Sequence, residues 1–251
     1  MVRGMSSASQ DPGSALGETT HFGFRTVAAA AKAGLVREVF DSVADRYDVM
    51  NDLMSFGVHR VWKNAMLDVL NPRPGLTYLD VAGGTGDIAF RIRERVAKKG
   101  GKARIVVADI NTEMLRVGRD RAIDKGIAAD LEWLCLDAQS VPLPDRSVDV
   151  YTIAFGLRNV TDIRRALAEA RRVLKPGGRF LCLEFSKVVL PVLDRAYDAY
   201  SFTVLPFLGR TVAHNAEAYR YLAESIRKMP PQDELAAWMA DAGFANVDYR
   251  N

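Results

Sequence analysis

This 251-residue sequence has little cysteine and no long apolar run. Its two cysteines, Cys135 and Cys182, lie inside short apolar segments, which we interpret as buried strands of a protein from a reducing compartment. Their spacing predicts no metal site and no disulfide framework. No segment reaches the roughly 18 unbroken apolar residues that a membrane-spanning helix needs, so we expect none.

The sequence also lacks a large excess of one charge and a targeting segment. Its 34 Lys and Arg residues nearly balance its 31 Asp and Glu residues, which argues against a nucleic-acid partner. Residues 1–20 contain no apolar signal core and are rich in Ser and Gly, so we interpret them as a disordered tail. We therefore expect a single domain over residues 21–251, located in the cytoplasm.

What the sequence does contain is a regular alternation of strand-like and helix-like segments. Helical spacing is clear where Ile88, Ile92 and Val96 recur every four residues. Strand-like runs occur at 77–83, 103–110, 131–138, 148–156 and 179–186. Strands that alternate with helices predict a parallel sheet with helices on both faces, which is a Rossmann-like α/β fold.

Three segments lie outside this alternation. Residues 36–70 have a helical pattern with a break near 55–57, and we predict that they form an N-terminal helical lid. A helical insertion follows the fifth strand, after Ser186. The run at 245–251 begins like a strand, but the antiparallel hairpin that commonly ends such a sheet is missing. The sequence leaves open whether that final strand is naturally absent or truncated.

A glycine-rich loop, LDVAGGTGD at 79–87, connects the first strand to the first helix. A dinucleotide-binding loop needs G-x-G-x-x-G, but the position of its third glycine is Ala89 here. The spacing fits D-x-(G/A)-x-G-x-G instead, which is typical of S-adenosylmethionine (SAM) loops. Gly84 and Gly86 can adopt positive φ and admit a ligand, and Asp80 can lie near the methionine ammonium. An ordinary strand-to-helix turn is the alternative.

The next two strands each end in an acidic residue. Asp109 is placed to accept the two ribose hydroxyls of the cofactor, although it could simply cap the following helix. Asp137 and Ala138 end the third strand, where an adenine amino group would lie. A solvated or capping Asp is the alternative for Asp137. Three successive strand ends would together form one crevice at the carboxyl edge of the sheet.

With these positions in hand, the chain resembles the ubiquinone/menaquinone C-methyltransferase family from about Thr20 onward. The most specific blocks are VFDSVADRYDVMNDLMSFGVHRVWK at 39–63 and FGLRNVTDIRRALAEARRVLKPGGRF at 155–180. The resemblance implies methyl transfer from SAM to a ring carbon of a polyprenylated quinol. It also implies SAM contacts at Thr85, Asp109, Asp137 and Ala138. Where the family often has a Ser, this chain has Ala154, so that hydroxyl contact is lost.

The chemistry that the resemblance implies needs a deprotonated or stabilised quinol hydroxyl. A free phenol titrates near pH 10, so the enzyme must stabilise the phenolate or accept the proton. We expect Arg158 to stabilise the developing phenolate charge and Asn159 to orient the ring hydroxyl. Tyr47, in the predicted lid, could reach the quinol. A helix-flanking surface position is the alternative for Arg158, and helix packing is the alternative for Tyr47.

The apolar part of the insertion, residues 188–209, is the candidate channel for an isoprenoid tail. An ordinary helical cap or a dimer surface would explain it equally well. Basic residues nearby could contact lipid headgroups, so we predict peripheral contact with the inner membrane. A homodimer or a quinone-biosynthesis complex is the assembly that we expect.

Three other functions compete with quinol C-methylation. The first is an O- or N-methyltransferase on the same fold, and the second is an NAD-dependent oxidoreductase, which the glycine spacing disfavours. The third is a non-catalytic methyltransferase-like subunit of a quinone-biosynthesis complex. The sequence does not decide whether the acceptor is a demethylmenaquinol, a 2-methoxy-6-polyprenyl-1,4-benzoquinol, or both.

Overall fold

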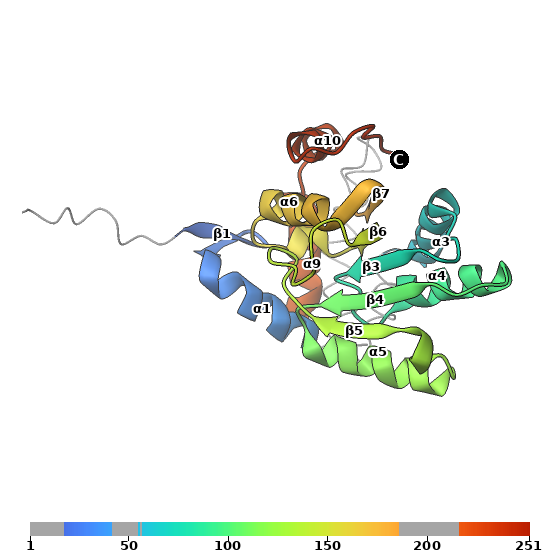
Figure 1. Cartoon of the computed structure of the whole chain (residues 1–251). Helices are drawn as coiled ribbons and strands as arrows, with labels where there is room; N and C mark the ends of the chain where they lie inside the picture. Colours follow the sequence, from blue (N-terminus) through green and yellow to red (C-terminus); the bar gives the residue numbers. More distant parts are fainter. Residues whose placement is uncertain (1–17, 42–54, 56, 186–215) are drawn as a thin grey trace, which may run out of the picture.

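The computed structural model describes residues 18–41, 55, 57–185 and 216–251 (Figure 1). Its centre is a five-stranded parallel sheet with strand order β5-β4-β3-β6-β7. The strands are β3 (Thr77–Val81), β4 (Arg104–Asp109), β5 (Glu132–Cys135), β6 (Val148–Ala154) and β7 (Leu174–Leu183). Because the order reverses between β3 and β6, a crevice opens at the carboxyl ends of these central strands.

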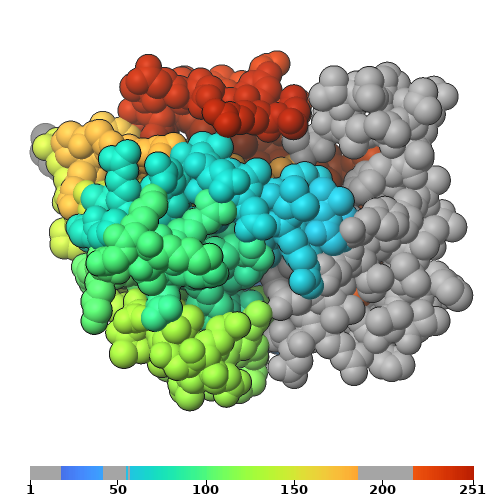
Figure 2. Space-filling view, turned by 90° about the vertical axis from the view of Figure 1, so that its right-hand side faces the viewer, coloured from blue at the N-terminus to red at the C-terminus, as the bar shows by residue number. Residues whose placement is uncertain are grey.

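Helices cover both faces of this sheet because side chains alternate between the faces along each strand. Leu79 and Val81 face the side covered by α6 (Ile163–Val173) and α10 (Gln232–Asp241). Tyr78 faces the other side, where it packs with α3 (His59–Leu70), α4 (Asp87–Lys98) and α5 (Thr112–Asp124). Figure 2 shows the end of the molecule where α3 and α4 (cyan to green) lie below α10 (red). The predicted Rossmann-like α/β fold is therefore confirmed.

A smaller unit packs beside the carboxyl edge of the sheet. It consists of the antiparallel hairpin β1 (Thr19–Phe22) and β2 (Arg25–Ala28), the helix α1 (Ala29–Asp41) and the helix α9 (Ala216–Lys228). Phe22, Val36, Phe40 and Tyr221 form its buried core. Two 3-10 turns, η3 (Ala128–Asp130) and η4 (Leu157–Asn159), complete the described elements.

The boundaries differ from the sequence prediction at the N-terminal side and in the fifth strand. The hairpin includes Thr19 and Thr20, which the sequence placed in the tail. Within the predicted lid range, 36–70, the structure has the end of α1 and all of α3, and residues 42–54 lie outside the described part. The fifth strand, β7, begins at Leu174 and contains a bulge, since Val148 faces Leu174 while Val150 faces Arg179.

Two other expectations are wrong. The strand predicted to begin at Ala245 is not formed, and Asn246 has φ +55°, which lies outside the extended region of a strand. The thiol of Cys135 is exposed rather than buried, since β5 is an edge strand of the sheet, whereas Cys182 is half-buried. Among the described residues, no helix is long and apolar enough to cross a bilayer.

Candidate functional site

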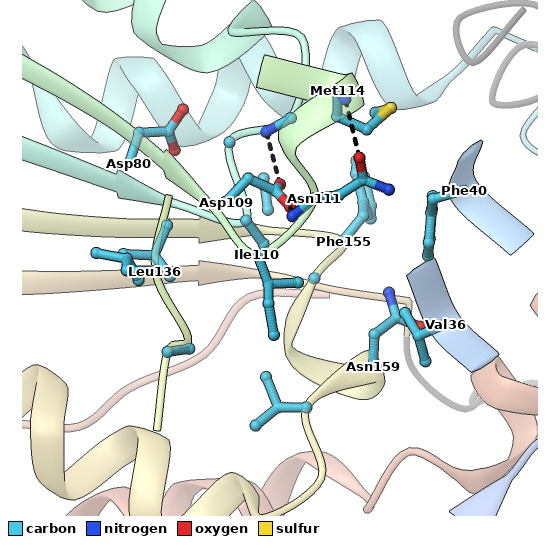
Figure 3. A pocket seen from close by; sticks show the side chains of 18 of the residues that line it. Val36, Phe40, Asp80, Asp109, Ile110, Asn111, Met114, Leu136, Phe155 and Asn159 are labelled. Atoms are coloured by element: carbon cyan, nitrogen blue, oxygen red, sulfur yellow. Dashed lines mark hydrogen bonds between the residues drawn. The ribbon is translucent and has the colours of Figure 1, made fainter. Parts of the chain in front are cut away.

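The carboxyl ends of β3, β4, β5 and β6 meet at one cavity, which Figure 3 shows from close by. The glycine loop and Asp80 form one wall, and the segments after β4 and β5 form the next. Val36 and Phe40 of α1 close the cavity from the opposite side. In a parallel sheet this is the expected position for a ligand, at the point where the strand order reverses.

The glycine loop follows β3 and lies against the cavity without bulky side chains. Gly84 has φ +50° and Gly86 has φ +84°, a region that favours glycine. A Cβ atom on Gly86 would lie 2.9 Å from ring atoms of Phe90 and Trp133, and one on Gly84 would lie 3.0 Å from the methyl of Met114. Both positions therefore require glycine, and the loop backbone can approach a ligand closely.

Asp80, the acid near the end of β3, has an unused acceptor. Its side chain is buried, and its Oδ1 accepts a hydrogen bond from the hydroxyl of Thr152 at 2.7 Å. Its Oδ2 is buried without a hydrogen-bond partner among the described residues. Burial raises the pKa of Asp80 to about 7, and the hydroxyl of Thr152 opposes that shift. A ligand that brings a cation or an N–H donor to Oδ2 would remove this deficit.

Asp109, at the end of β4, links this strand to the glycine loop. Its Oδ2 accepts the N–H of Gly84 at 2.9 Å and its Oδ1 accepts the N–H of Asn111 at 2.8 Å. Burial raises the pKa of Asp109 to about 6, although these backbone donors lower it. Each carboxylate oxygen has a second lone pair, so Asp109 can still accept two hydroxyl groups from a ligand.

The segment after β5 forms a third part of the wall. Oδ1 of Asp137 accepts the backbone N–H of Gln139 at 2.8 Å, and Ala138 is buried at the cavity. Gln139 in turn accepts the N–H of Asp162 through its side-chain oxygen.

Thr85, in the glycine loop, is buried at the cavity, and its hydroxyl accepts a hydrogen bond from Arg121 at 2.9 Å. All the candidate cofactor residues except Gly86 therefore line one cavity, and Gly86 lies in its loop.

The sequence analysis did not predict an ion pair at this cavity between a buried lysine and a half-buried aspartate. Nζ of Lys63, in α3, lies 2.8 Å from Oδ2 of Asp87, the first residue of α4. Burial alone would raise the pKa of Asp87, but Lys63 and Arg91 hold it below its ordinary value. The ammonium of Lys63 also lies 5.9 Å from the centre of the Phe155 ring. The available signal was a lysine on the buried face of an amphipathic helix, where a charge needs a partner.

The three candidate catalytic residues are not brought together in the described part of the structure. Asn159, at the end of η4, lines the cavity (Figure 3). Arg158 does not line it: its Nη1 lies 2.9 Å from Oε2 of Glu184, and it lines a second cavity near β1 and α9. Successive side chains of a 3-10 turn diverge by about 120°, so neighbours face different sides. Tyr47 lies outside the described residues.

Comparison with known sequences places these features in one group of enzymes. A family model described as the ubiE/COQ5 methyltransferase family matches residues 26–251. The chain is 56% identical over 245 residues to the ubiquinone/menaquinone biosynthesis C-methyltransferase UbiE of Brucella suis biovar 1 (strain 1330), covering 96% of this chain and 90% of that protein. It is 57% identical over 232 residues to the protein of the same name from Brucella anthropi, covering 92% and 87%.

Comparison with solved structures supports the fold. A SAM-dependent methyltransferase from Aquifex aeolicus superposes with a TM-score of 0.54 at 20% identity, covering 81% of this chain and 87% of that chain. The [4+2]-cyclase SpnF gives a TM-score of 0.57 at 19% identity, covering 76% and 88%. One fold therefore supports different reactions, and the residues of the site determine which reaction occurs.

Proposed function

The chain belongs to the ubiE/COQ5 methyltransferase family, and from this membership we propose that it methylates a ring carbon of a polyprenylated quinol, with SAM as methyl donor, in ubiquinone or menaquinone biosynthesis. The observation that carries the proposal is 56% identity to a C-methyltransferase of these pathways over 96% of the chain. The cavity at the sheet edge supplies the site. The non-catalytic alternative is not favoured by this similarity.

The residues of the cavity fit SAM by the chemistry of their atoms. The unpartnered Oδ2 of Asp80 suits the α-ammonium of the methionine part, and Asp109 retains acceptors for the ribose hydroxyls. Asp137 and Ala138 border the space for the adenine ring, while Lys63 is the buried cation for the α-carboxylate. When bound, SAM supplies a methyl group already activated for transfer, so the protein has mainly to position the two reactants and exclude water.

The apolar residues of the cavity perform that second task. Phe40, Met114, Leu136 and Phe155 line the cavity beside the acids. Such walls exclude water from the ring and strengthen the electrostatic contacts inside the site. Burial among these apolar side chains also explains why the pKa of Asp80 is raised in the empty cavity. A cationic ligand beside the carboxylate would lower that pKa again.

The remaining task is to manage the proton of the quinol hydroxyl. As this proton leaves to solvent, negative charge would develop on the ring oxygen. The neighbouring ring carbon would take the methyl group as the methyl–sulfur bond breaks, and it would then lose its own proton while the ring oxygen regains one. We assign Asn159 to donate a hydrogen bond to that oxygen, because its side chain lines the cavity. Arg158 acts indirectly. Its guanidinium pairs with Glu184 on the other side of the turn that carries Asn159, and so holds that turn in place. Tyr47 remains a predicted quinol contact.

We also propose that the protein works at a membrane surface, on its cytoplasmic side. The support is chemical: a polyprenylated quinol partitions into lipid, so the enzyme must collect it there. The candidate tail channel, 188–209, lies outside the described residues. Assembly as a homodimer or within a quinone-biosynthesis complex stays a prediction. Sedimentation with anionic and neutral vesicles would test the surface contact. Absence of binding to both kinds of vesicle would contradict it.

The decisive experiment is complementation of a bacterial strain that lacks the ring C-methylation step. Growth with restored methylated quinones, identified by mass spectrometry, is the expected result. The masses also decide between a naphthoquinol acceptor, a benzoquinol acceptor, and both. Purified protein that binds SAM but transfers no methyl group to a short-chain quinol of either class would overturn the proposal in favour of a non-catalytic role.

A further inference from the structure

Asn159 receives a hydrogen bond that selects one orientation of its side-chain amide. The hydroxyl of Tyr221, in α9, donates to Oδ1 of Asn159 at 2.9 Å. An amide has an acceptor oxygen and an NH2 donor that differ little in shape, so a partner must decide which atom faces which way. Since Oδ1 faces Tyr221, Nδ2 is the atom left for the cavity, which Asn159 lines.

Tyr221 is rigidly held and stays a donor. Its side chain is 4% exposed, and its ring stacks on Phe22 with centroids 4.2 Å apart and planes 21° from parallel. Val36 and Phe40 of α1 belong to the same core cluster. Burial, with a smaller contribution from Glu184, raises the pKa of Tyr221, whereas Arg158 lowers it. The phenol therefore keeps its proton at neutral pH and can donate it to Asn159.

The backbone of the turn that carries Asn159 is fixed from two other elements. The N–H of Arg158 donates to Oε1 of Glu184 at 3.2 Å, next to the end of β7. Nζ of Lys32, in α1, donates to the carbonyl of Val160 at 2.9 Å. With the backbone fixed in this way, rotation of the Asn159 side chain is the remaining freedom. In the flipped amide the hydroxyl of Tyr221 could only accept a hydrogen bond from Nδ2, and its own proton would lose Oδ1, the acceptor that it has in the structure.

We propose that Tyr221 is a positioning residue that orients the Asn159 amide so that Nδ2 donates to the quinol ring oxygen as negative charge develops on it. The inference rests on the proposed function and adds to it the donor atom and the residue that selects it. A donor aimed in advance at the developing charge needs no reorganisation during the reaction. Without Tyr221, the amide can turn its oxygen toward the ring oxygen, where two acceptors repel.

The test compares Tyr221→Phe, Asn159→Ala and the double variant, with Tyr78→Phe as the matched control. Tyr78 is also a buried tyrosine, but its hydroxyl bonds to Arg73 outside the cavity. We expect Tyr221→Phe to lower kcat roughly 10-fold and Asn159→Ala roughly 100-fold, since loss of one such donor has effects of this order. In the Asn159→Ala background, Tyr221→Phe should change kcat less than 2-fold. SAM Kd should stay within 2-fold throughout, and Tyr78→Phe should leave kcat unchanged.

A second readout does not depend on turnover. The side-chain amide resonances of Asn159, assigned by their loss in Asn159→Ala, should shift in Tyr221→Phe and stay in place in Tyr78→Phe. Unchanged amide resonances, or unchanged kcat in Tyr221→Phe with an active wild-type enzyme, would overturn the inference. Fully additive effects in the double variant would do the same. Failure of the wild-type protein to methylate a quinol would instead count against the proposed function, which the amide readout distinguishes.

Discussion

At the scale of single residues, the cavity holds two acids whose pKa values are raised above their ordinary range when no ligand is present. The pKa of Asp80 is raised to about 7 and that of Asp109 to about 6, in both cases mainly by burial. An acid whose pKa is raised in the folded state stabilises the fold below its unfolded pKa, near 4. That contribution is lost as the pH rises through the folded pKa. The site is thus prepared for a cation at some expense of stability.

Replacement of Asp80 by Asn should remove much of this pH dependence. For the unliganded wild-type protein, we expect Asp80 alone to lower the free energy of unfolding by roughly 2–3 kcal/mol between pH 5 and pH 8, because each pKa unit corresponds to about 1.4 kcal/mol. Asp80→Asn should show a correspondingly smaller decrease and at least ~10-fold weaker SAM binding at pH 8. Urea unfolding at both pH values measures it, with the exposed Asp124→Asn as control. Equal pH dependence in wild type and Asp80→Asn would contradict the assignment.

Arg158 allows a second prediction at this scale. Its guanidinium and the Glu184 carboxylate are 1% and 5% exposed, so each variant leaves a buried charge without its partner. Arg158→Ala should lower turnover, keep SAM affinity nearly unchanged, and reduce the free energy of unfolding by roughly 3–5 kcal/mol. Glu184→Gln retains the guanidinium and should destabilise less. Turnover equal to wild type in folded Arg158→Ala would show that Arg158 has no part in the reaction.

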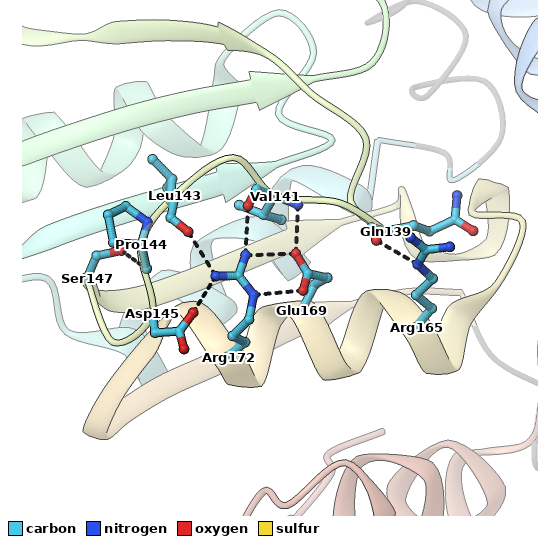
Figure 4. Close-up of polar contacts among 9 residues, drawn as sticks. All are labelled: Gln139, Val141, Leu143, Pro144, Asp145, Ser147, Arg165, Glu169 and Arg172. Atoms are coloured by element: carbon cyan, nitrogen blue, oxygen red, sulfur yellow. Dashed lines mark hydrogen bonds and ion pairs between the residues drawn. The ribbon is translucent and has the colours of Figure 1, made fainter.

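At the scale of elements, the loop after β5 is held in place by α6 (Figure 4). Arg172 donates to the carbonyls of Val141 and Leu143 and pairs with Asp145 and Glu169, all between 2.7 and 2.9 Å. The two carboxylates, Glu169 foremost, hold the pKa of Arg172 above its ordinary value. This loop follows directly after the candidate adenine contacts, so one arginine of α6 positions the third wall of the cavity.

Arg172→Lys tests that role because a lysine ammonium cannot reproduce a guanidinium fork that makes contacts in several directions. We expect a loss of roughly 1–2 kcal/mol in the free energy of unfolding, measured by urea denaturation. We also expect weaker SAM binding, measured by titration calorimetry. Arg164→Lys is the matched control in the same helix, since Arg164 is exposed and pairs with exposed Asp241. An equal effect of the two substitutions would contradict a special role for Arg172.

Two glycines at the opposite ends of β3 provide a further pair of variants: Gly75 precedes this strand, and Gly86 lies in the loop that follows it. Gly86 and Gly75 have similar φ values, +84° and +80°, but a Cβ on Gly75 would meet no atom within 4 Å. Gly75→Ala should therefore show backbone strain alone, about 1 kcal/mol. Gly86→Ala should lose roughly 1–3 kcal/mol more, because its Cβ would lie 2.9 Å from the rings of Phe90 and Trp133. Thermal unfolding of the two variants measures the difference, and equal losses would show that the loop can relax.

At the scale of the whole molecule, a ligand that occupies the cavity contacts four strands, the glycine loop and α1 at once. Binding to the folded state alone should therefore stabilise the complete domain. We expect SAM at 100 times its Kd to raise the free energy of unfolding by about 2.7 kcal/mol. NADH at the same concentration should leave it unchanged, since the loop lacks the dinucleotide spacing. Stabilisation by NADH but not by SAM would overturn the cofactor assignment.

The sequence by itself determined the sheet and the position of the cavity. Alternating apolar segments and the loop at 79–87 depend on local periodicity and on glycine conformations, which are properties of short segments. The acids at the strand ends were found because parallel strands place their carboxyl ends at one edge. Asp80, Asp109 and Asp137 were therefore predictable together as lining residues, although their roles stay predictions.

Only the tertiary structure decided which side chains face the cavity from elsewhere in the chain. Lys63 pairs with a residue 24 positions away, and Tyr221 bonds to Asn159 from 62 positions away. The side chains of Arg158 and Asn159 point to different sides because a 3-10 turn has three residues per turn and because Glu184, after the end of β7, binds the guanidinium of Arg158. Such contacts depend on how elements pack in three dimensions, and local sequence patterns do not encode that packing.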